Sequence, residues 1–451
     1  MRLTNTLDGT TSLFEPASPP RVGIYVCGPT VYDVPHVGHA RAAVVFDVLR
    51  RHLTWRGYDV LFVRNITDVE DKIINRANSD GVHPAVIAER YTRVYDDAMR
   101  ALGVLDPDIA PRASGHIPEM VEMIGRLVER GHAYEGEGSV WFSVESFVGY
   151  GKLSGRTIDV MLNQERVEPA PGKAHPLDFA LWKAAKPGEP SWGSPWGPGR
   201  PGWHIECSAM TVRYLGMPFD IHGGGADLIF PHHENEIAQA EAALGHEPLA
   251  RWWLHNGHVQ ISGEKMSKSL RNFVQVDAVL EEYAPQVLRM FFMSSHYRSQ
   301  INYTLEALEE ARAVWDRFAA FLRTGPLGAE DETLLDAFGE AMDDDLNTPA
   351  AIASLHALVS EGNRALGEGD EGRAATVRAS VAAALDLLGC EPEAPVHGEE
   401  VLAPLVQLLL EQREHARAAK DFNRADEIRD RLAEAGVKVE DSAEGPRWFV
   451  E

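Results

Sequence analysis

Arg21-Val-Gly-Ile-Tyr-Val-Cys27 is the stretch that decides the fold, because it is a short apolar run rich in β-forming residues. A Gly28-Pro29 turn follows, and we expect a helix from about Gly38 to about Arg51. Residues 59–65 form a second run of the same kind. A strand, a helix and a strand in this order make a crossover unit with parallel pairing. The sequence therefore predicts a doubly wound α/β fold.

The rest of the first 300 residues extends this pattern. Residues from about 85 to 130 are predicted to be helical, and residues 131–200, rich in Gly, Pro and Trp, are interpreted as an insertion that opens with a hairpin at 133–144. Residues 219–225 predict a strand that runs into a glycine loop. We expect a helix from His232 to Leu244, after which residues 252–261 resume the sheet.

From Thr304 onward the pattern becomes helical. Apolar side chains recur at spacings of three and four, which predicts one buried stripe: Leu308, Ala311, Trp315, Phe318 and Leu322. Further helices are predicted at 333–342 and 349–366, and a long helix with a mixed-charge end in the last 50 or so residues. The sequence therefore predicts a helical bundle followed by a small C-terminal domain.

Bulk properties point to the cytosol. No apolar run reaches the roughly 18 residues that a membrane span needs, and the first residues lack the pattern of a secretory signal. Three cysteines, Cys27, Cys207 and Cys390, are too few for a disulfide framework. The formal net charge of -25 disfavours non-specific nucleic-acid binding, although a specific site depends on local potential.

His36-Val-Gly-His39 lies between the first strand and its helix, at the edge where doubly wound sheets bind nucleotides. A small residue between two imidazoles lets a phosphate approach the helix N-terminus. The histidines could then donate to a phosphate as negative charge builds. Two ordinary polar histidines are the alternative, and the motif alone favours that interpretation.

Lys265-Met-Ser-Lys-Ser269 follows about 230 residues later, after the last predicted strand. Two lysines in a short loop suit a pyrophosphate, because an ammonium is a compact charge on a flexible stem. Most such pentapeptides are solvated surface loops. The two motifs in this order around one sheet nevertheless indicate a nucleotide site.

Four side chains are candidates for a zinc site. Cys27 ends the first strand, and Cys207 lies in Trp203-His-Ile-Glu-Cys-Ser-Ala-Met210. His232 and Glu236, four residues apart, share one helix face. Two thiolates, an imidazole and a carboxylate suit tetrahedral zinc. His233, three residues from Glu236, is a rival imidazole. The alternative is that both cysteines are simply buried apolar residues.

Over nearly its whole length the chain resembles cysteinyl-tRNA synthetase, a class I aminoacyl-tRNA synthetase with a Rossmann-like catalytic domain. The resemblance rests on both signature motifs and on these blocks: Tyr25-Val-Cys-Gly-Pro-Thr-Val-Tyr-Asp33, Arg64-Asn-Ile-Thr-Asp-Val-Glu-Asp-Lys72, Asp178-Phe-Ala-Leu-Trp-Lys183, Gly199-Arg-Pro-Gly-Trp-His-Ile-Glu-Cys-Ser-Ala-Met210, residues 219–236 and Ala341-Met-Asp-Asp-Asp-Leu-Asn-Thr-Pro349. Blocks of this length are far more specific than either signature.

The resemblance implies roles for individual residues. The family's zinc ligands fall on Cys27, Cys207, His232 and Glu236, which favours His232 over His233. Its ATP-binding signatures fall on Pro29, Thr30, His36, Gly38 and His39, and on Lys265, Met266, Ser267, Lys268 and Ser269. Its cysteine pocket falls on Gly28, Thr67, Trp203 and His222. Its anticodon contacts fall on Arg417, Phe422, Asp426 and Asp441.

The implied reaction joins L-cysteine to tRNA(Cys) through a cysteinyl-adenylate made with ATP and Mg²⁺. His36 and His39 would hold the α-phosphate, while Lys265 and Lys268 would hold the departing pyrophosphate. One zinc ion per subunit would select cysteine over serine, because it binds a thiolate well and a hydroxyl poorly. Residues 131–200 are too few for an editing domain.

The family pattern also divides the chain, which we expect to be a cytoplasmic monomer with no membrane partner. The expected parts are 1–120 and 201–262 as two halves of the catalytic domain, 121–200 as the insertion, 263–303 as the second-signature and tRNA-stem region, 304–395 as the helical bundle and 396–451 as the anticodon-recognition domain. The chain departs from the family at Val37, Glu70 and Arg271, where isoleucine, aspartate and glycine are usual.

Three other functions compete with this one. A cysteine ligase of mycothiol biosynthesis shares the zinc and ATP motifs but lacks the C-terminal region that this chain has from Arg413 onward. A zinc hydrolase would use Glu234 as its base but leaves Lys265–Ser269 unexplained. A non-catalytic zinc protein that binds RNA is the third.

Overall fold

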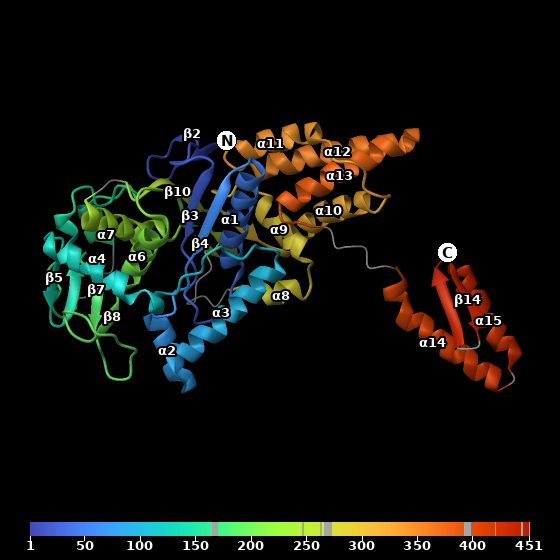
Figure 1. Cartoon of the computed structure of the whole chain (residues 1–451), viewed down its shortest axis with the longest axis horizontal. Coiled ribbons are helices and arrows are strands. Elements are labelled where there is room, and N and C mark those ends of the chain that lie inside the picture. Colours follow the sequence, from blue (N-terminus) through green and yellow to red (C-terminus); the bar gives the residue numbers. More distant parts are fainter. Residues whose placement is uncertain are drawn as a thin grey trace. The chain divides into compact units, whose positions relative to one another are not determined.

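The structure is a computed structural model that describes residues 1–164, 170–245, 248–261, 264–265, 273–391, 398–419, 421–442 and 445–450 (Figure 1). The chain packs as two compact units, Met1–Glu391 and Pro392–Glu451. Among the described residues, no helix combines the length and the apolar character needed to cross a membrane.

A parallel sheet lies at the centre of the first unit. Its strands are ordered β10 (Ala250–Asn256), β9 (Phe219–Gly225), β3 (Arg21–Val26) and β4 (Asp59–Arg64). Helix α1 (Val37–Trp55) connects β3 to β4, which pair in parallel from Arg21 with Asp59 onward. The predicted crossover unit is thus confirmed, with a helix slightly longer than expected.

Helices cover both faces of this sheet, as a doubly wound fold requires. Ile24 points into the core shared with α1, while its neighbour Tyr25 points into the opposite core. That second core includes side chains of α4 (Ile117–Glu129), α6 (Trp203–Leu215) and α7 (Glu234–Leu244). The alternation of successive strand residues separates the two cores.

The strand order creates a switch point between β3 and β9. From β3 the chain moves outward to β4 on one side, and β9 and β10 are added later on the other side. Crevices at the carboxyl ends of the strands flanking such a point are where doubly wound sheets bind ligands. Cys27 follows β3 directly, and His222 lies in the middle of β9, paired with Tyr25.

The insertion forms a second, antiparallel sheet. Its strands are β5 (Ala133–Gly136), β6 (Ser139–Phe142), β7 (Phe179–Ala184) and β8 (Gly199–Pro201), in that order. The predicted hairpin is therefore confirmed as β5–β6. A short helix, α5 (Ile158–Gln164), lies between β6 and β7.

Two expectations about the sheet were wrong. The glycines after His222 continue β9 as far as Gly225 instead of forming a loop. A Cβ at Gly223 would lie 2.3 Å from the Phe46 ring of α1, so this glycine provides space for helix packing. The predicted strand at 252–261 breaks at Gly257, after which β11 (Val259–Ile261) joins a different sheet.

The sheet that β11 joins is small. Strand β11 pairs in parallel with β13 (Ile301–Tyr303) and antiparallel with β12 (Glu264–Lys265). The remaining α-helices and strands described before α10 are β1 (Arg2–Thr4), β2 (Thr11–Leu13), α2 (Asp71–Asp80), α3 (Pro84–Ala101), α8 (Val276–Leu280) and α9 (Pro285–Met293).

The helical region confirms most of its predicted pattern. It comprises α10 (Leu305–Leu322), α11 (Asp336–Asp343), α12 (Thr348–Glu368) and α13 (Glu371–Leu387). Four residues of the predicted stripe are buried: Leu308, Ala311, Trp315 and Phe318. At the end of the stripe the prediction was off by one residue, because Phe321 is buried whereas Leu322 is only partly buried.

The second unit is a small α/β fold. It contains α14 (Gly398–Ala418), α15 (Phe422–Glu434) and a hairpin of β14 (Val437–Ser442) and β15 (Gly445–Val450). Its own core is small and apolar: Val406, Leu410, Ile428, Leu432 and Val437. The six-part division of the chain stays a prediction.

Candidate functional site

The four predicted zinc ligands lie together at the switch point. The Sγ atoms of Cys27 and Cys207 are 3.6 Å apart, although the residues are 180 positions apart in the sequence. Glu236 Oε1 lies 3.3 Å from Cys27 Sγ and 3.1 Å from His232 Nε2. Strand β3, helix α6 and the start of α7 therefore converge on one cluster.

The spacing of these atoms fits a tetrahedral metal ion. Zinc bonds of about 2.3 Å to sulfur and about 2.0–2.1 Å to nitrogen or oxygen place neighbouring ligand atoms about 3.3–3.8 Å apart. The measured separations of 3.1–3.6 Å come close to that range. A disulfide would need the sulfurs at about 2.05 Å. The cluster thus suits a metal and contains no disulfide.

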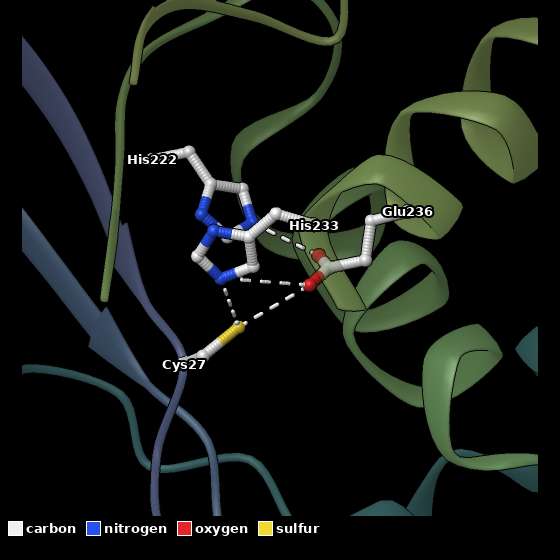
Figure 2. A group of neighbouring side chains, drawn as sticks. All are labelled: Cys27, His222, His233 and Glu236. Atoms are coloured by element: carbon white, nitrogen blue, oxygen red, sulfur yellow. Dashed lines mark hydrogen bonds and ion pairs between the residues drawn. The ribbon is translucent and has the colours of Figure 1, made fainter. Parts of the chain in front are cut away.

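A second group shares two of these residues. Figure 2 shows Cys27 and Glu236 together with His222 and His233. His233 Nε2 lies 3.3 Å from Cys27 Sγ, and His222 Nε2 lies 2.9 Å from Glu236 Oε2. Among the described residues, either group brings its ligand atoms within 4.8 Å of one another. Distance alone does not choose between them.

Neighbouring contacts orient the ligand atoms of both groups. His222 hydrogen-bonds one carboxylate oxygen of Glu236, so that the other oxygen, Oε1, faces Cys27 and His232. His204 Nδ1 lies 2.9 Å from His232 Nδ1, so that Nε2 of His232 points at Glu236. Outer partners that orient ligands in this way are typical of metal sites. The second group has the same kind of support, because His255 Nε2 lies 2.8 Å from His233 Nδ1. These contacts therefore do not choose between the groups, and the family resemblance is what favours the group with two sulfurs.

Electrostatics within the cluster favour a thiolate on Cys207. Burial raises the pKa of Cys207, but the hydrogen bond with Cys27 and the contact with His232 outweigh burial and lower that pKa to about 6. Burial lowers the pKa of His232, but the charges of Glu236 and Cys207 raise it to about 10. Burial and the neighbouring thiolate raise the pKa of Cys27 well above its usual value. The cluster can therefore hold opposite charges even without a metal.

The residues predicted to bind the amino acid surround the cluster. The Trp203 ring stacks on His232 with centroids 4.2 Å apart, and His222 contacts Glu236. Gly28 follows Cys27, and a Cβ there would lie 1.6 Å from the carbonyl oxygen of Asn65, so only glycine fits. Thr67 is buried and its N–H donates to the carbonyl of Pro29 at 3.2 Å.

The two histidines of the first signature begin α1. His36 is the N-cap, and its Nδ1 accepts from the Gly38 N–H at 3.1 Å. His39 Nδ1 accepts from the His36 N–H at 3.3 Å, and the two rings stack with centroids 3.8 Å apart. Because both Nδ1 atoms accept, a neutral ring carries its proton on Nε2. Each histidine therefore has an Nε2–H donor near the helix N-terminus.

The chain just after the second signature lies beside the first one. The N–H of Val37 donates to the carbonyl of Val274 at 2.9 Å, and the N–H of Val276 donates to the carbonyl of Pro35 at 3.1 Å. The Phe273 ring stacks on His36 with centroids 4.8 Å apart. Met266–Ser269 and Arg271 lie outside the described residues, and only the backbone of Lys265 is described.

Three of the predicted anticodon residues flank one turn of the second unit. Arg417 lies near the end of α14, and Phe422 begins α15. Phe422 is 62% exposed, and Asp426 lies one helical turn beyond it on the same face. Asp441 lies in β14, and its side chain is outside the described residues.

Two further histidines beside the cluster, His204 and His255, were not predicted as site residues. His204 contacts His232, and His255 Nε2 lies 2.8 Å from His233 Nδ1. The position of His204 three residues before Cys207 was the available signal for one of them. His255 lies near the end of β10, and only the strand order brings it to the cluster.

The proposed hydrolase base has a structural role instead. Glu234 is fully buried, and its carboxylate accepts from the N–H groups of Leu153 at 3.2 Å and Ser154 at 2.8 Å. It belongs to neither candidate metal group among the described residues. The carboxylate therefore holds the insertion against α7.

Three family models match successive parts of the chain. Residues 13–313 match the tRNA synthetases class I (C) catalytic domain. Residues 337–390 match the DALR domain, and residues 400–448 match the cysteinyl-tRNA ligase anticodon binding domain.

Curated relatives match over the full length. The cysteine–tRNA ligase of Geobacter metallireducens is 49% identical, with 100% of this chain and 99% of that protein covered. The enzyme of the same name from Halorhodospira halophila is 50% identical, with 99% of each chain covered. That of Streptomyces avermitilis is 49% identical over 97% of this chain and 96% of the relative.

Solved structures with similar folds include aminoacyl-tRNA synthetases. Mycobacterium tuberculosis methionyl-tRNA synthetase with methionyl-adenylate gives a TM-score of 0.58 at 17% identity, covering 82% of this chain and 89% of that one. The ternary complex of Agrobacterium radiobacter LeuRS gives 0.59 at 14% identity, covering 86% and 88%. At such low identity these similarities establish the fold alone.

Proposed function

This chain belongs to the cysteine–tRNA ligase family of class I aminoacyl-tRNA synthetases, and from that premise we propose that it activates L-cysteine with ATP and transfers it to the 3′ end of tRNA(Cys). The observation that carries the proposal is the full-length match at about 50% identity to cysteine–tRNA ligases. The anticodon-binding domain matched at 400–448 favours this function over the mycothiol ligase, whose family lacks that region.

We further propose that Cys27, Cys207, His232 and Glu236 hold a zinc ion. The close spacing of their ligand atoms, all within 4.8 Å of one another, and the contacts of His222 with Glu236 and of His204 with His232 support this set. Zinc in such a site binds a thiolate and lowers its pKa, which a serine hydroxyl cannot match. Selection by shape alone would distinguish two such small side chains by only about 1–3 kcal/mol.

Residues beside the cluster would shape the amino-acid pocket. Trp203 stacks on His232 and presents its ring beside the cluster. Gly28 lets the backbone of Asn65 occupy the place that a side chain would take, which holds the chain next to Cys27 in close contact with Asn65. We assign these two residues, with Thr67 and His222, to holding the cysteine substrate.

The nucleotide would bind at the start of α1. There the cysteine carboxylate attacks the α-phosphorus of ATP, the bond to the β-phosphate oxygen breaks and pyrophosphate leaves. His36 and His39 supply Nε2–H donors beside a helix N-terminus, which suits the charge that builds on the α-phosphate. We assign Lys265 and Lys268 to the departing pyrophosphate, with Mg²⁺ as its counterion.

The second unit would read the anticodon. Phe422 offers an exposed ring on which a base can stack. Arg417 and Asp426 flank it at the same turn and offer hydrogen-bonding groups. We place the protein in the cytoplasm as a monomer.

Two assays run side by side test the function. We expect cysteine-dependent exchange between ATP and radioactive pyrophosphate, and cysteine-dependent charging of tRNA(Cys). Serine in place of cysteine is the control for selectivity, and an amino-sugar acceptor is the control for the competing ligase. Exchange without tRNA charging would contradict the proposal, as would ligation of cysteine to the sugar.

A further inference from the structure

Arg41 is a fully buried arginine two residues beyond His39 in α1. Its guanidinium donates to the main-chain carbonyls of Gly257 at 2.8 Å and His258 at 2.9 Å. It also donates to those of Ser299 at 2.6 Å and Tyr297 at 3.4 Å. The helix that begins with the signature histidines is therefore fastened to two other chain segments.

These two segments are packed unusually tightly. The Gly257 N–H donates to the Tyr297 carbonyl at 2.8 Å, and a Cβ at Gly257 would lie 2.3 Å from the Ser299 carbonyl oxygen. The absence of a side chain at Gly257 is what lets one guanidinium reach both segments. A planar fork of five donors suits this arrangement, whereas an ammonium does not.

The first of these segments leads to the second signature. Gly257 and His258 join β10 to β11, and β11 pairs with β12, which ends at Lys265. The chain that returns after the signature pairs its backbone with the segment around His36. The start of α1 thus contacts the chain on both sides of the second signature.

A buried guanidinium is expensive, so its presence needs a reason. Removing a charge from water costs several kcal/mol unless hydrogen bonds replace the solvent. An apolar side chain of similar volume would avoid that cost but would leave the carbonyls of Gly257, His258 and Ser299 without the donor that joins the two segments. The arginine at this position therefore indicates that it fixes the geometry between the two segments and does not merely fill space.

We propose that Arg41 is a positioning residue that holds β11 and β12, and with them Lys265, at a fixed distance from His36 and His39. Both signatures can then reach one triphosphate in the arrangement that the transition state requires. This inference rests on the proposed function of the two signatures in ATP binding.

The test replaces Arg41 with Met and with Lys and measures cysteine-dependent pyrophosphate exchange. We expect the turnover number of Arg41→Met to fall by about 100-fold, since a displacement of about 1 Å can cost that much. The KM for cysteine and the zinc content should stay within about twofold of wild type, because a lost alignment of groups that act only in the transition state lowers kcat selectively. Arg41→Lys should recover part of the rate.

A matched control separates positioning from stability. Arg378 is equally buried and donates to Pro326 and Thr324 in the helical region. We expect Arg378→Met to lower the melting temperature while leaving the exchange rate per folded molecule near wild type. Equal rate losses in the two variants would overturn the positioning role, as would an Arg41→Met protein that turns over normally.

A second variant keeps the test decisive if Arg41→Met does not fold. Gly257→Ala pushes the same two segments apart without changing Arg41, and we expect it to reduce kcat with the cysteine KM preserved. A Gly257→Ala protein with the wild-type rate would overturn the inference. If the wild-type protein itself shows no cysteine-dependent exchange, the proposed function fails and not merely the role of Arg41.

Discussion

The cluster around Cys27 and the turn between α14 and α15 are two proposed recognition sites with opposite environments. Glu236 is fully buried and Cys207 is 1% exposed, whereas Phe422 is 62% exposed. In the cluster, charges interact with little water between them, so each substitution leaves an uncompensated neighbour. At the turn, water and salt screen the charges. The comparison teaches that effect size should follow burial.

The two sites also differ in how the chain builds them. The cluster combines side chains from β3, α6 and α7, whose residues are up to 209 positions apart. The turn places Arg417 and Phe422 five positions apart in one small unit. Four substitutions test this contrast, from the largest expected effect to the smallest.

The largest effect should come from Cys207→Ser. Because Cys207 is a direct ligand in the proposed site, we expect a loss of zinc affinity greater than the about 10–100-fold typical of an outer-shell partner. Metal analysis and exchange assays with cysteine and serine measure it. Cys390→Ser is the control, since this buried cysteine belongs to neither candidate metal group among the described residues. Full zinc and unchanged discrimination in Cys207→Ser would show that the metal role is wrong.

A smaller effect should come from His222→Leu, which removes the hydrogen bond to Glu236 Oε2. We expect zinc affinity to fall by about 10–100-fold, measured by competition with a chelator. His222→Gln keeps a hydrogen-bond donor near the same place, so its loss of zinc affinity should be smaller. If the two variants bind zinc equally well, this contact does not orient the carboxylate.

At the exposed turn, Phe422→Ala should weaken tRNA charging alone. Loss of one stacking contact costs about 1–3 kcal/mol, so we expect kcat/KM for tRNA to fall by roughly 5–150-fold. Pyrophosphate exchange should not change. Phe422→Trp, which keeps a stacking face, is the matched control. A charging rate unaffected by alanine would remove Phe422 from the anticodon site.

The smallest effect should come from Asp343, whose partly exposed carboxylate pairs with Arg56 and belongs to neither site. Burial raises the pKa of Asp343, but hydrogen bonds from His52 and Arg56 outweigh it and lower that pKa to about 2. Because the folded-state pKa lies below the unfolded one, the stabilisation is present at neutral pH and is lost as the pH falls from about 4 to about 2.

We expect this pair to contribute about 1 kcal/mol at neutral pH, since partial exposure screens it. Urea unfolding of wild type and Asp343→Asn at about pH 7 and at about pH 3 measures it. The difference between the proteins should shrink at the lower pH. A difference that is constant with pH would assign the effect to packing instead of charge.

Sequence patterns predicted the elements well where the signal was local. The β3–α1–β4 unit, the β5–β6 hairpin and the amphipathic stripe of α10 each follow from spacings of two, three or four residues. The two errors in the sheet have a common cause. Gly223 and Gly257 are glycines because Phe46 and Ser299 approach them from distant segments, which no local pattern reveals.

In the candidate site, too, local sequence patterns reveal some features and only the fold reveals the others. Candidate ligands and the two signatures could be picked out from the sequence, and the family resemblance favours His232 over His233. No sequence pattern reveals that Glu236 directs one carboxylate oxygen to His222 and the other to His232. Nor does any pattern single out Arg41, whose four acceptors are backbone carbonyls that carry no residue type.

By itself, then, the amino-acid order determined the periodicity of helices and strands, the chemical types available for a site and the family to which the chain belongs. Tertiary structure alone decided which of those groups meet. The physical reason is that hydrophobic periodicity acts within one helix or strand. The order β10-β9-β3-β4 of the parallel strands, in contrast, sets which strand ends, and therefore which side chains, become neighbours.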